Sequence, residues 1–353
     1  MASQHDLTQA LRLQMQHAYR HHTPVRIQGG GSKPCYGHSV TGELLDVSSH
    51  SGIIEYDAAE LVLTARAGTP ITLIDAVLAE HGQILAFEPP HFATKATLGG
   101  TVACNVSGPR RPYAGAVRDA VLGCTVLDGR GQVLKFGGQV MKNVAGFDVS
   151  RLMAGALGTL GVLLDISIKV LPSAPCELTL AQPMDIEEAV LRMNQLAGQS
   201  WPLTAGAWVA GELYLRFSST QAATDHVANV LTGRTISNEF WAQLKEQQLD
   251  FFQQARTLWR LSLPPTAKQP DLPGSWLIDW GGAQRWLASN AAEDVVRQQT
   301  AQLGGHAMLY RSDTSPLEVF QPLHPPLFAL HRGLKQVFDP AGILNPGRMY
   351  RGL

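Results

Sequence analysis

The sequence ATLGGTVACNVSGPRRPYAGAVR, residues 96–118, combines small side chains with positive charge. Its small residues leave the main chain uncovered, and three arginines follow them: Gly99, Gly100, Ala103, Ser107 and Gly108, then Arg110, Arg111 and Arg118. Small side chains let a flat, bulky ligand approach the backbone, and amide N–H and guanidinium groups stabilise an anion. The stretch therefore predicts one wall of a site for a large anionic ligand.

Two further glycine-rich runs point to the same ligand. Gly29–Gly31 follows a predicted strand in which Val25 and Ile27 alternate with polar residues. Pro34 ends the run, so it fits neither the P-loop nor the dinucleotide-binding glycine pattern. A phosphate loop and a plain turn both remain open for Gly29–Gly31. For Gly155–Gly161, the third glycine run of the sequence, the alternative to ligand binding is tight packing of a helix on a strand.

Composition limits the class of protein. The 353 residues predict about two domains, and 45% hydrophobic residues are enough for a large core. A charged fraction of only 16% suggests surface covered by partner subunits, although a compact monomer has a similar composition. The net charge of −1 and the lack of a Lys/Arg-rich tail argue against nucleic-acid binding.

Several kinds of site and segment are missing from the sequence. The four cysteines have no CxxC spacing, and HExxH and HxH are absent, so we expect buried thiols and no iron–sulfur, zinc or other metal site. No run approaches the roughly 20 apolar residues of a membrane span. Residues 1–22 have the pattern of an amphipathic helix rather than a signal peptide. We therefore expect a cytoplasmic protein that meets a membrane only through partners.

Secondary-structure patterns predict three segments. Residues 1–172 form a first α+β domain with a helix over 70–81, N-capped by Thr69, and with strands over 119–127, 132–136 and 162–170. The first two of these strands form a hairpin about Asp128-Gly129. Residues 323–353 form a helix and a turn-rich segment that docks back on this domain.

Residues 173–322 are predicted as a second domain, an antiparallel sheet with helices on one face. The expected helices cover 185–198, 221–231, 239–254 and 293–303. The expected strands are a hairpin about Gly211 within 205–218, followed by 258–263, 276–280 and 306–311.

Five motifs, taken together and in order, resemble the vanillyl-alcohol-oxidase-type (PCMH-type) FAD-binding family. They are GGGSK (29–33), ATLGG (96–100), RDAVLGCTVLDGRGQVLKFGG (118–138), VAGFDVSRLMAGALGTLGVLLDISIKVLP (144–172) and DPAGILNPGR (339–348). Further segments, such as LIDWGGAQRWL (277–287) and ILNPGRMY (343–350), resemble the smaller FAD-binding subunits of bacterial glycolate oxidases. The resemblance implies an α+β fold in which two subdomains hold FAD and an antiparallel-sheet cap domain, residues 173–322, covers the flavin.

The resemblance also implies which residues bind FAD. The glycine loop would surround the pyrophosphate, residues 97–101 would follow the dinucleotide, 161–163 would meet the adenine half, and the C-terminal segment would close near the flavin. The complete set is Gln28, Gly29, Gly30, Gly31, Ser32, Lys33, Pro90, Thr97, Leu98, Gly99, Gly100, Thr101, Asn105, Gly108, Arg110, Lys142, Asn143, Gly146, Asp148, Gly161, Val162, Leu163, Asn345 and Arg348.

Two departures from the family pattern matter. Ser32 and Lys33 stand where many members carry the histidine that attaches FAD, so the resemblance implies non-covalent FAD. His38 lies too far along the motif to be assigned as the linker, and His91 is a second, weaker candidate. Related 2-hydroxy-acid dehydrogenases have an H-x-G-D-G-N-x-H-like segment in the cap. Here GGHAMLY (304–310) keeps a single histidine. No catalytic residue is therefore assigned, and oxidation of a substrate by this subunit alone is not favoured.

Three functions follow from these observations. In the first, the chain is one FAD subunit of a glycolate (or D-lactate) dehydrogenase complex, in which a larger FAD subunit oxidises the 2-hydroxy acid and an iron–sulfur subunit passes electrons to a quinone. In the second, the chain is a self-contained FAD enzyme, with Arg110 or Arg111 binding a carboxylate and His306 or His331 acting as base. Structural roles are favoured for all four.

The third function is a redox-silent structural subunit stabilised by FAD. Seven tryptophans are compatible with an interface, since Trp is enriched in hot spots, although a place in the core of the cap is favoured for each: Trp201, Trp208, Trp241, Trp259, Trp276, Trp280 and Trp286.

Overall fold

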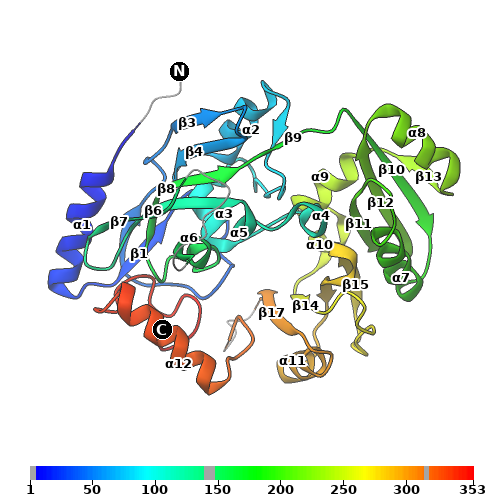
Figure 1. Ribbon diagram of the computed structural model, residues 1–353. Helices are drawn as coiled ribbons and strands as arrows, with labels where there is room; N and C mark the ends of the chain where they lie inside the picture. Colours follow the sequence, from blue (N-terminus) through cyan, green and yellow to red (C-terminus); the bar gives the residue numbers. More distant parts are fainter. Residues whose placement is uncertain (1–4, 139–147, 314–317) are drawn as a thin grey trace. The chain divides into compact units, whose positions relative to one another are not determined.

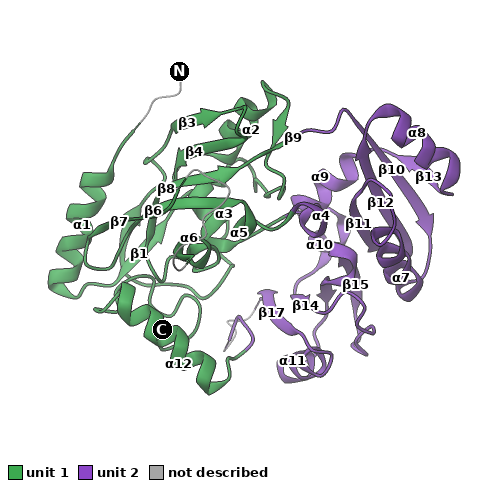
Figure 2. Cartoon of the chain, viewed as in Figure 1, with its two compact units in different colours: residues 1–107, 115–172, 322–353 green, residues 108–114, 173–321 purple. Residues whose placement is uncertain are grey.

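The computed structural model describes residues 5–138, 148–313 and 318–353, which fall into two compact units (Figures 1 and 2). Unit 1 comprises residues 1–107, 115–172 and 322–353, and unit 2 comprises 108–114 and 173–321. The chain passes from one unit to the other four times. The short segment 108–114, which the predicted ranges assign to the first domain, belongs to unit 2. The roles of the units as FAD domain and cap stay predictions.

Unit 1 is built on a five-stranded antiparallel sheet in the order β3-β4-β8-β6-β7. The strands are β3 (Ile53–Asp57), β4 (Val62–Arg66), β6 (Val121–Leu127), β7 (Val133–Gly137) and β8 (Val162–Lys169). The predicted strand at 162–170 is confirmed as β8, which lies at the centre and is largely buried on both faces. The predicted hairpin is confirmed as β6–β7, where the Asp128 carboxylate accepts hydrogen bonds from the amides of Arg130 and Gln132.

Two smaller strand pairs and several helices surround this sheet. The strands β1 (Val25–Gln28) and β2 (Glu43–Asp46) pair in parallel, and β5 (Gln83–Ile84) pairs with β9 (Leu171–Pro172). The helices are α1 (Thr8–His21), α2 (Ile71–Ala79), α3 (Leu98–Cys104), α5 (Val117–Ala120), α6 (Val149–Met153) and α12 (Pro325–Phe338). As the spacing predicts, α1 buries Leu11, Met15 and Ala18.

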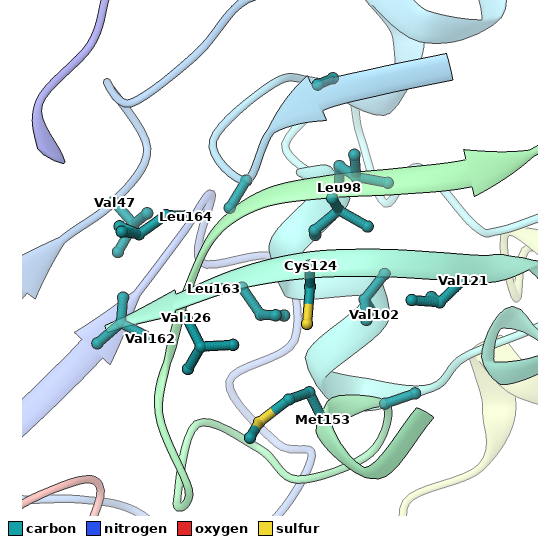
Figure 3. Close-up of a cluster of buried hydrophobic side chains, with 14 of the residues drawn as sticks. Val47, Leu98, Val102, Val121, Cys124, Val126, Met153, Val162, Leu163 and Leu164 are labelled. Atoms are coloured by element: carbon teal, nitrogen blue, oxygen red, sulfur yellow. The ribbon is translucent and has the colours of Figure 1, made fainter. Parts of the chain in front are cut away.

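The core of unit 1 fixes α3 against the central strands. Figure 3 shows Leu98 and Val102 of α3 close to Cys124 of β6 and to side chains of β8. Leu98 and Val102 are fully buried. Burial raises the pKa of the Cys124 thiol to about 11, so this group stays neutral in the core. Because α3 is held in this way, its first turn has a fixed position beside the glycine loop.

Three local predictions are wrong. Thr69 is not the N-cap of α2, because its hydroxyl instead bonds the main chain of Gly52 and Pro70 takes the cap position. The predicted helix 239–254 is two helices, α9 (Glu239–Lys245) and α10 (Asp250–Gln254), separated near Gln247, whose φ is 56°. The beginning of the predicted strand 119–127 is helical and belongs to α5.

Unit 2 contains an eight-stranded antiparallel sheet in the order β13-β10-β12-β11-β15-β16-β14-β17. The strands are β10 (Cys176–Pro183), β11 (Leu203–Val209), β12 (Glu212–Ser219), β13 (Arg234–Ile236), β14 (Leu258–Ser262), β15 (Ser275–Asp279), β16 (Gln284–Ala288) and β17 (His306–Arg311). The short elements α4 (Arg111–Ala114) and η1 (Trp280–Gly282) complete the unit. The α+β class with antiparallel sheets is confirmed.

The two faces of this sheet differ in chemistry. The longer helices α7 (Ile186–Ala197), α8 (Gln221–Val230) and α11 (Glu293–Gln302) pack on an apolar face through the buried clusters around Leu215 and Leu261. The strand register puts Arg216, Arg260 and His306 on the other face. Trp241 of α9 and Phe252 of α10 contact residues of that polar face, so the prediction of helices on one face only is incorrect.

The tryptophans predicted as core residues are mostly buried. Trp241, Trp259, Trp280 and Trp286 are buried in unit 2, which favours the core interpretation over an interface for these four.

None of the helices in the described part of the chain is long and apolar enough to cross a membrane. Across the same residues, no group of three or more His, Cys, Asp or Glu side chains is placed to hold a metal ion.

Candidate functional site

A cavity of about 430 Å³ lies in unit 1, between the end of β1, the start of α3, the 156–163 segment and the C-terminal turns. Many of the predicted ligand-binding residues line it: Gln28, Gly29, Gly30, Gly31, Ser32, Lys33, Thr97, Gly99, Gly100, Gly161, Val162, Leu163, Asn345 and Arg348. The three glycine runs of the sequence therefore meet around one space. Contact of each of these residues with a ligand stays a prediction.

The glycine loop presents main-chain donors to this cavity. A Cβ at Gly30 would lie 1.6 Å from the Lys95 carbonyl oxygen, so no larger residue fits there, and Gly31 has a φ of 65°. Within the described residues, the amides of Gly29, Gly30, Gly31 and Ser32 have no hydrogen-bond acceptor. Successive amides without acceptors form a concave site for an anion. The plain-turn alternative does not explain these free donors.

Lys33 adds a positive charge at the end of the loop. Its side chain is only 9% exposed, with Nζ 3.2 Å from the Ser32 hydroxyl and 5.3 Å from the centre of the Phe92 ring. A cation withdrawn from water in this way gains from an anionic partner more than an exposed one does. The loop and Lys33 together suit a phosphate-bearing ligand.

The start of α3 forms the wall beside the loop, since a Cβ at Gly29 would lie 2.6 Å from the Thr97 hydroxyl oxygen. Thr97 caps the helix by accepting a hydrogen bond from the Gly100 amide at 3.3 Å. A Cβ at Gly99 would lie 2.6 Å from that of Ala67, so glycine lets the helix rest directly on the segment after β4. On its cavity side α3 carries only glycines and small side chains: Gly99, Gly100, Ala103 and Cys104. This is the arrangement that the small residues of the opening stretch predict.

The C-terminal segment holds the cavity walls together. The Asn345 side chain accepts a hydrogen bond from the Ile27 amide at 2.8 Å and donates one to the Leu157 carbonyl at 2.7 Å. Arg348 donates to the main-chain oxygens of His38 at 2.6 Å and Lys33 at 3.3 Å. Burial lowers the pKa of the Arg348 guanidinium. Both side chains line the cavity, and both position other segments of it.

Several predicted residues of unit 1 do not line the cavity. Leu98 and Thr101 point from α3 into the core and are fully buried. Asn105 ends α3 in the left-handed conformation and accepts a hydrogen bond from the Arg118 amide. Asp148 caps α6 and pairs with Arg151 at 3.0 Å. Pro90 also lies outside the lining.

The other predicted residues lie in unit 2 or outside the described residues. Gly108 accepts a hydrogen bond from the Trp280 indole, and Arg110 pairs with Glu177 at 2.7 Å, both within unit 2. Arg110 therefore has a structural role as an ion-pair partner, the kind of role that the sequence favours for it. Lys142, Asn143 and Gly146 are not among the described residues.

The residue set implied by the resemblance omits about half of the lining, although Ala103 lies in the small-residue stretch 96–118. The additional residues are Arg26, Ile27, Pro34, Ser39, Val40, Val47, Ala67, Ala103, Cys104, Met153, Ala156, Leu157 and Gly158. Those at 156–158 stand inside the third glycine run, which is the one signal that could have identified them. Most of the others give the cavity an apolar lining. Burial raises the pKa of the Cys104 thiol, which keeps it protonated near neutral pH.

Histidines are absent from the cavity lining in the described part of the chain. His91 lies 2.8 Å from the Asp75 carboxylate, and the His331 ring packs against Tyr350. His306 lies in unit 2, where burial and the nearby Arg260 lower its pKa. The two histidines considered as bases therefore belong to different units, and neither borders the cavity.

Unit 2 carries a second group of polar side chains. The Arg111 and Arg260 guanidinium carbons lie 4.3 and 5.2 Å from the centre of the Trp280 ring. Arg260 also donates to Gln284 at 2.6 Å. Cation–π contacts of this kind hold the two arginines in fixed positions. Positive charge gathers there, and the candidate base His306 lies near Arg260 on the same face of the sheet.

Comparisons with known proteins match FAD-linked families in two parts of the chain and a glycolate oxidase subunit along nearly its whole length. The family described as FAD binding domain matches residues 6–137, and that described as FAD linked oxidases, C-terminal domain, matches 320–349. Glycolate oxidase subunit GlcE of Escherichia coli (strain K12) is 46% identical over 348 residues, 99% of each chain. Glycolate oxidase subunit GlcD of Bacillus subtilis (strain 168) is 32% identical over 163 residues, 45% of this chain and 34% of that protein.

A solved structure has the same fold. The crystal structure of p-cresol methylhydroxylase with substrate bound aligns over 97% of this chain and 87% of its own, with a TM-score of 0.74 and 15% sequence identity. At this identity the likeness shows the fold alone. The PCMH-type fold predicted from the sequence motifs is confirmed.

Proposed function

The chain belongs to the FAD-linked oxidoreductase family that contains glycolate oxidase subunit GlcE, and on that premise we propose that it is an FAD-carrying subunit of a complex that oxidises glycolate. FAD is its cofactor. When bound, the flavin supplies one- and two-electron transfer chemistry, and the protein supplies binding, orientation and electrostatics. Similarity to a subunit along 99% of both chains supports the proposal.

The observation that carries the proposal is the donor set of the cavity. Four adjacent amides, Gly29 to Ser32, have no acceptor among the described residues and stand next to the buried Lys33 at one edge of a space with apolar walls. These groups fit the pyrophosphate of a dinucleotide, and the uncovered main chain at Gly99 and Gly100 fits a flat ring system. Residues Gly161 to Leu163 would border the adenine half. We infer non-covalent attachment, because the lining contains no histidine among the described residues.

Partner subunits are part of the proposal because the described residues that line the cavity include no base. The titratable side chains that line it are Arg26, Lys33, Cys104 and Arg348. The pKa of Cys104 is raised by burial, and the other three are cations, so none accepts a proton readily near neutral pH. A larger FAD subunit would remove hydrogen from the 2-hydroxy acid, D-lactate being a second substrate, and an iron–sulfur subunit would pass electrons to a quinone. Any membrane contact would be made through the complex.

Two measurements test the proposal. The purified chain is expected to show a flavin spectrum, and acid precipitation is expected to release the flavin into the supernatant. A colourless protein that cannot be reconstituted with FAD would contradict flavin binding. Anaerobic glycolate is then added to the isolated chain and to the assembled complex. The proposal expects bleaching of this flavin in the complex only.

A self-contained 2-hydroxy-acid dehydrogenase is a second candidate. It is favoured by the positive charge of Arg111 and Arg260 in unit 2, which suits a carboxylate. Bleaching of the isolated chain by glycolate would favour this alternative. A redox-silent structural subunit is the third candidate, and flavin that is never reduced in the assembled complex would favour it.

A further inference from the structure

The turn that precedes α3 has an unusual backbone. Phe92, Ala93 and Thr94 have φ values of 44°, 56° and 67°, so three successive residues other than glycine take the left-handed conformation. A Cβ disfavours this region, and single residues rather than runs ordinarily occupy it. Such backbone persists where the surrounding structure holds it, and it gathers at segments that bind ligands. The run therefore indicates a function for a side chain that it places.

Hydrogen bonds at both ends hold the turn in place. The His91 ring lies 2.8 Å from the Asp75 carboxylate of α2. The Ala96 amide donates to the His91 carbonyl at 3.0 Å and closes the turn, and the Ala96 carbonyl accepts from the Ile71 amide at 2.9 Å. Ile71 begins α2 and is fully buried, so the turn is tied to the core of unit 1.

The turn lies directly against the glycine loop. A Cβ at Gly30 would lie 1.6 Å from the Lys95 carbonyl oxygen, which shows how closely the two segments approach. The centre of the Phe92 ring lies 5.3 Å from Lys33 Nζ, within the range of a cation–π contact. The Ser32 hydroxyl lies 3.2 Å from the same nitrogen. Ring and hydroxyl together fix the position of the ammonium.

An aromatic ring holds a cation without cancelling its charge. A carboxylate in its place would neutralise the ammonium, whereas the ring attracts it through the negative potential of the ring face. Lys33 is buried and lines the cavity. A lysine side chain has many rotamers, and restricting them when a ligand binds weakens the binding. With Phe92 in contact, much of this restriction is already present before the ligand arrives.

We propose that Phe92 is a positioning residue, which holds the Lys33 ammonium where the pyrophosphate of the ligand binds. The proposal rests on the proposed function, in which the cavity binds FAD. It goes further by assigning a role to a residue outside the cavity lining and by giving a reason for the left-handed backbone at 92–94.

Fluorinated phenylalanines at position 92 of the full chain test the contact. Each added fluorine weakens the negative potential of the ring face and changes the size of the ring little. The apoprotein is titrated with FAD, and the Kd should rise with each fluorine, to about fivefold for a trifluorinated ring. The same substitutions at Phe136, whose ring packs against Phe338, are the control and should leave the Kd unchanged.

A double-mutant cycle separates this role from packing. Phe92→Leu should bind FAD about fivefold more weakly than wild type, and Phe92→Tyr, which keeps an aromatic face, should bind like wild type. In a Lys33→Gln background, Phe92→Leu should change the Kd less than about twofold, because the cation that the ring holds is gone. Equal losses in the two backgrounds, or a Phe92→Tyr protein as weak as Phe92→Leu, would overturn the proposal.

The outcomes distinguish this inference from the proposed function. A wild-type chain that does not bind FAD would contradict the proposed function itself. Wild-type binding with a constant Kd along the fluorinated series would overturn the positioning role alone. A Kd that falls along the series would also overturn it, since the ring would then compete with the phosphate for Lys33. The fluorinated series keeps the ring in place, so it decides the matter even where Phe92→Leu does not fold.

Discussion

The Arg348 guanidinium donates a hydrogen bond to the main-chain oxygen of His38 across 2.6 Å, although the two residues are 310 positions apart in the chain. The same guanidinium reaches the Lys33 carbonyl at 3.3 Å. Arg348 thus holds the segment that follows the glycine loop, on the side of the cavity where we propose that the pyrophosphate binds.

Replacing Arg348 should weaken flavin binding by loosening that segment. For Arg348→Ala we expect roughly tenfold to hundredfold weaker FAD binding, because hydrogen bonds from a charged donor contribute about 1.5–3 kcal/mol. Arg348→Lys should restore little, since an ammonium cannot reproduce the planar fork. Titration of the apoprotein with FAD measures the effect. Arg332→Ala is the control, and an unchanged Kd for Arg348→Ala would refute the positioning role.

A methyl group at Gly30 should be incompatible with the folded loop. Its Cβ would lie 1.6 Å from the Lys95 carbonyl oxygen, so Gly30→Ala should lower the free energy of unfolding by about 3 kcal/mol or more and abolish FAD retention. Gly333→Ala is the matched control. Nothing lies within 4 Å of its Cβ and the position is helical, so alanine should stabilise the protein by about 0.5–1 kcal/mol. Thermal unfolding and flavin content report both variants.

Removing the charge of Lys33 should affect flavin binding without unfolding the protein. Lys33→Gln is expected to bind FAD roughly tenfold to hundredfold more weakly, because a buried cation next to the proposed pyrophosphate is lost. Lys33→Arg should recover part of the affinity. High salt should reduce this loss of FAD affinity less than it would reduce the loss caused by replacing an exposed lysine. Lys135→Gln on β7 is the control, and equal Kd values for the two variants would contradict the assignment.

Acidification should destabilise unit 1 in part through His331. Burial lowers the pKa of this imidazole below its ordinary value of 6.5. As the pH falls through that value, the unfolded chain takes up a proton before the folded chain does, so the free energy of unfolding decreases. The decrease ends once the pH is below the lowered pKa. Urea unfolding at pH 7.5 and 5.5 should show a smaller difference for His331→Gln than for wild type. An equal difference in the two proteins would show that His331 does not contribute.

Local sequence patterns predicted much of the fold and of the cavity. Helix α1, strand β8, the β6–β7 hairpin and the sheet of unit 2 follow from hydrophobic spacing and turn residues, which act over short distances. The glycine runs predicted where main chain would be uncovered. Gly30 and Gly99 have no side chain because neighbouring atoms occupy the space that one would need. Crowding of this kind can be predicted from a sequence, because it restricts the position to small residues.

The remaining features depend on contacts between distant residues. Arg110 pairs with Glu177, a partner 67 positions away, so nothing in its local sequence distinguishes an ion pair from a ligand contact. The Asn345 amide joins Ile27 to Leu157, and Thr69 bonds Gly52 instead of capping α2. For the same reason, the passage of residues 108–114 into unit 2 has no local signature in composition.

The contacts of Asn345 also set an order of events during protein synthesis. The ribosome makes the glycine loop early, but the side chain that ties β1 to Leu157 is added more than three hundred residues later. A nascent chain that has not yet reached residue 345 therefore contains the amide donors of the glycine loop but lacks the Asn345 side chain that holds β1 against Leu157. If FAD binds this cavity as we propose, we expect it to bind only after translation has passed residue 345, because the donors are not held in place before then.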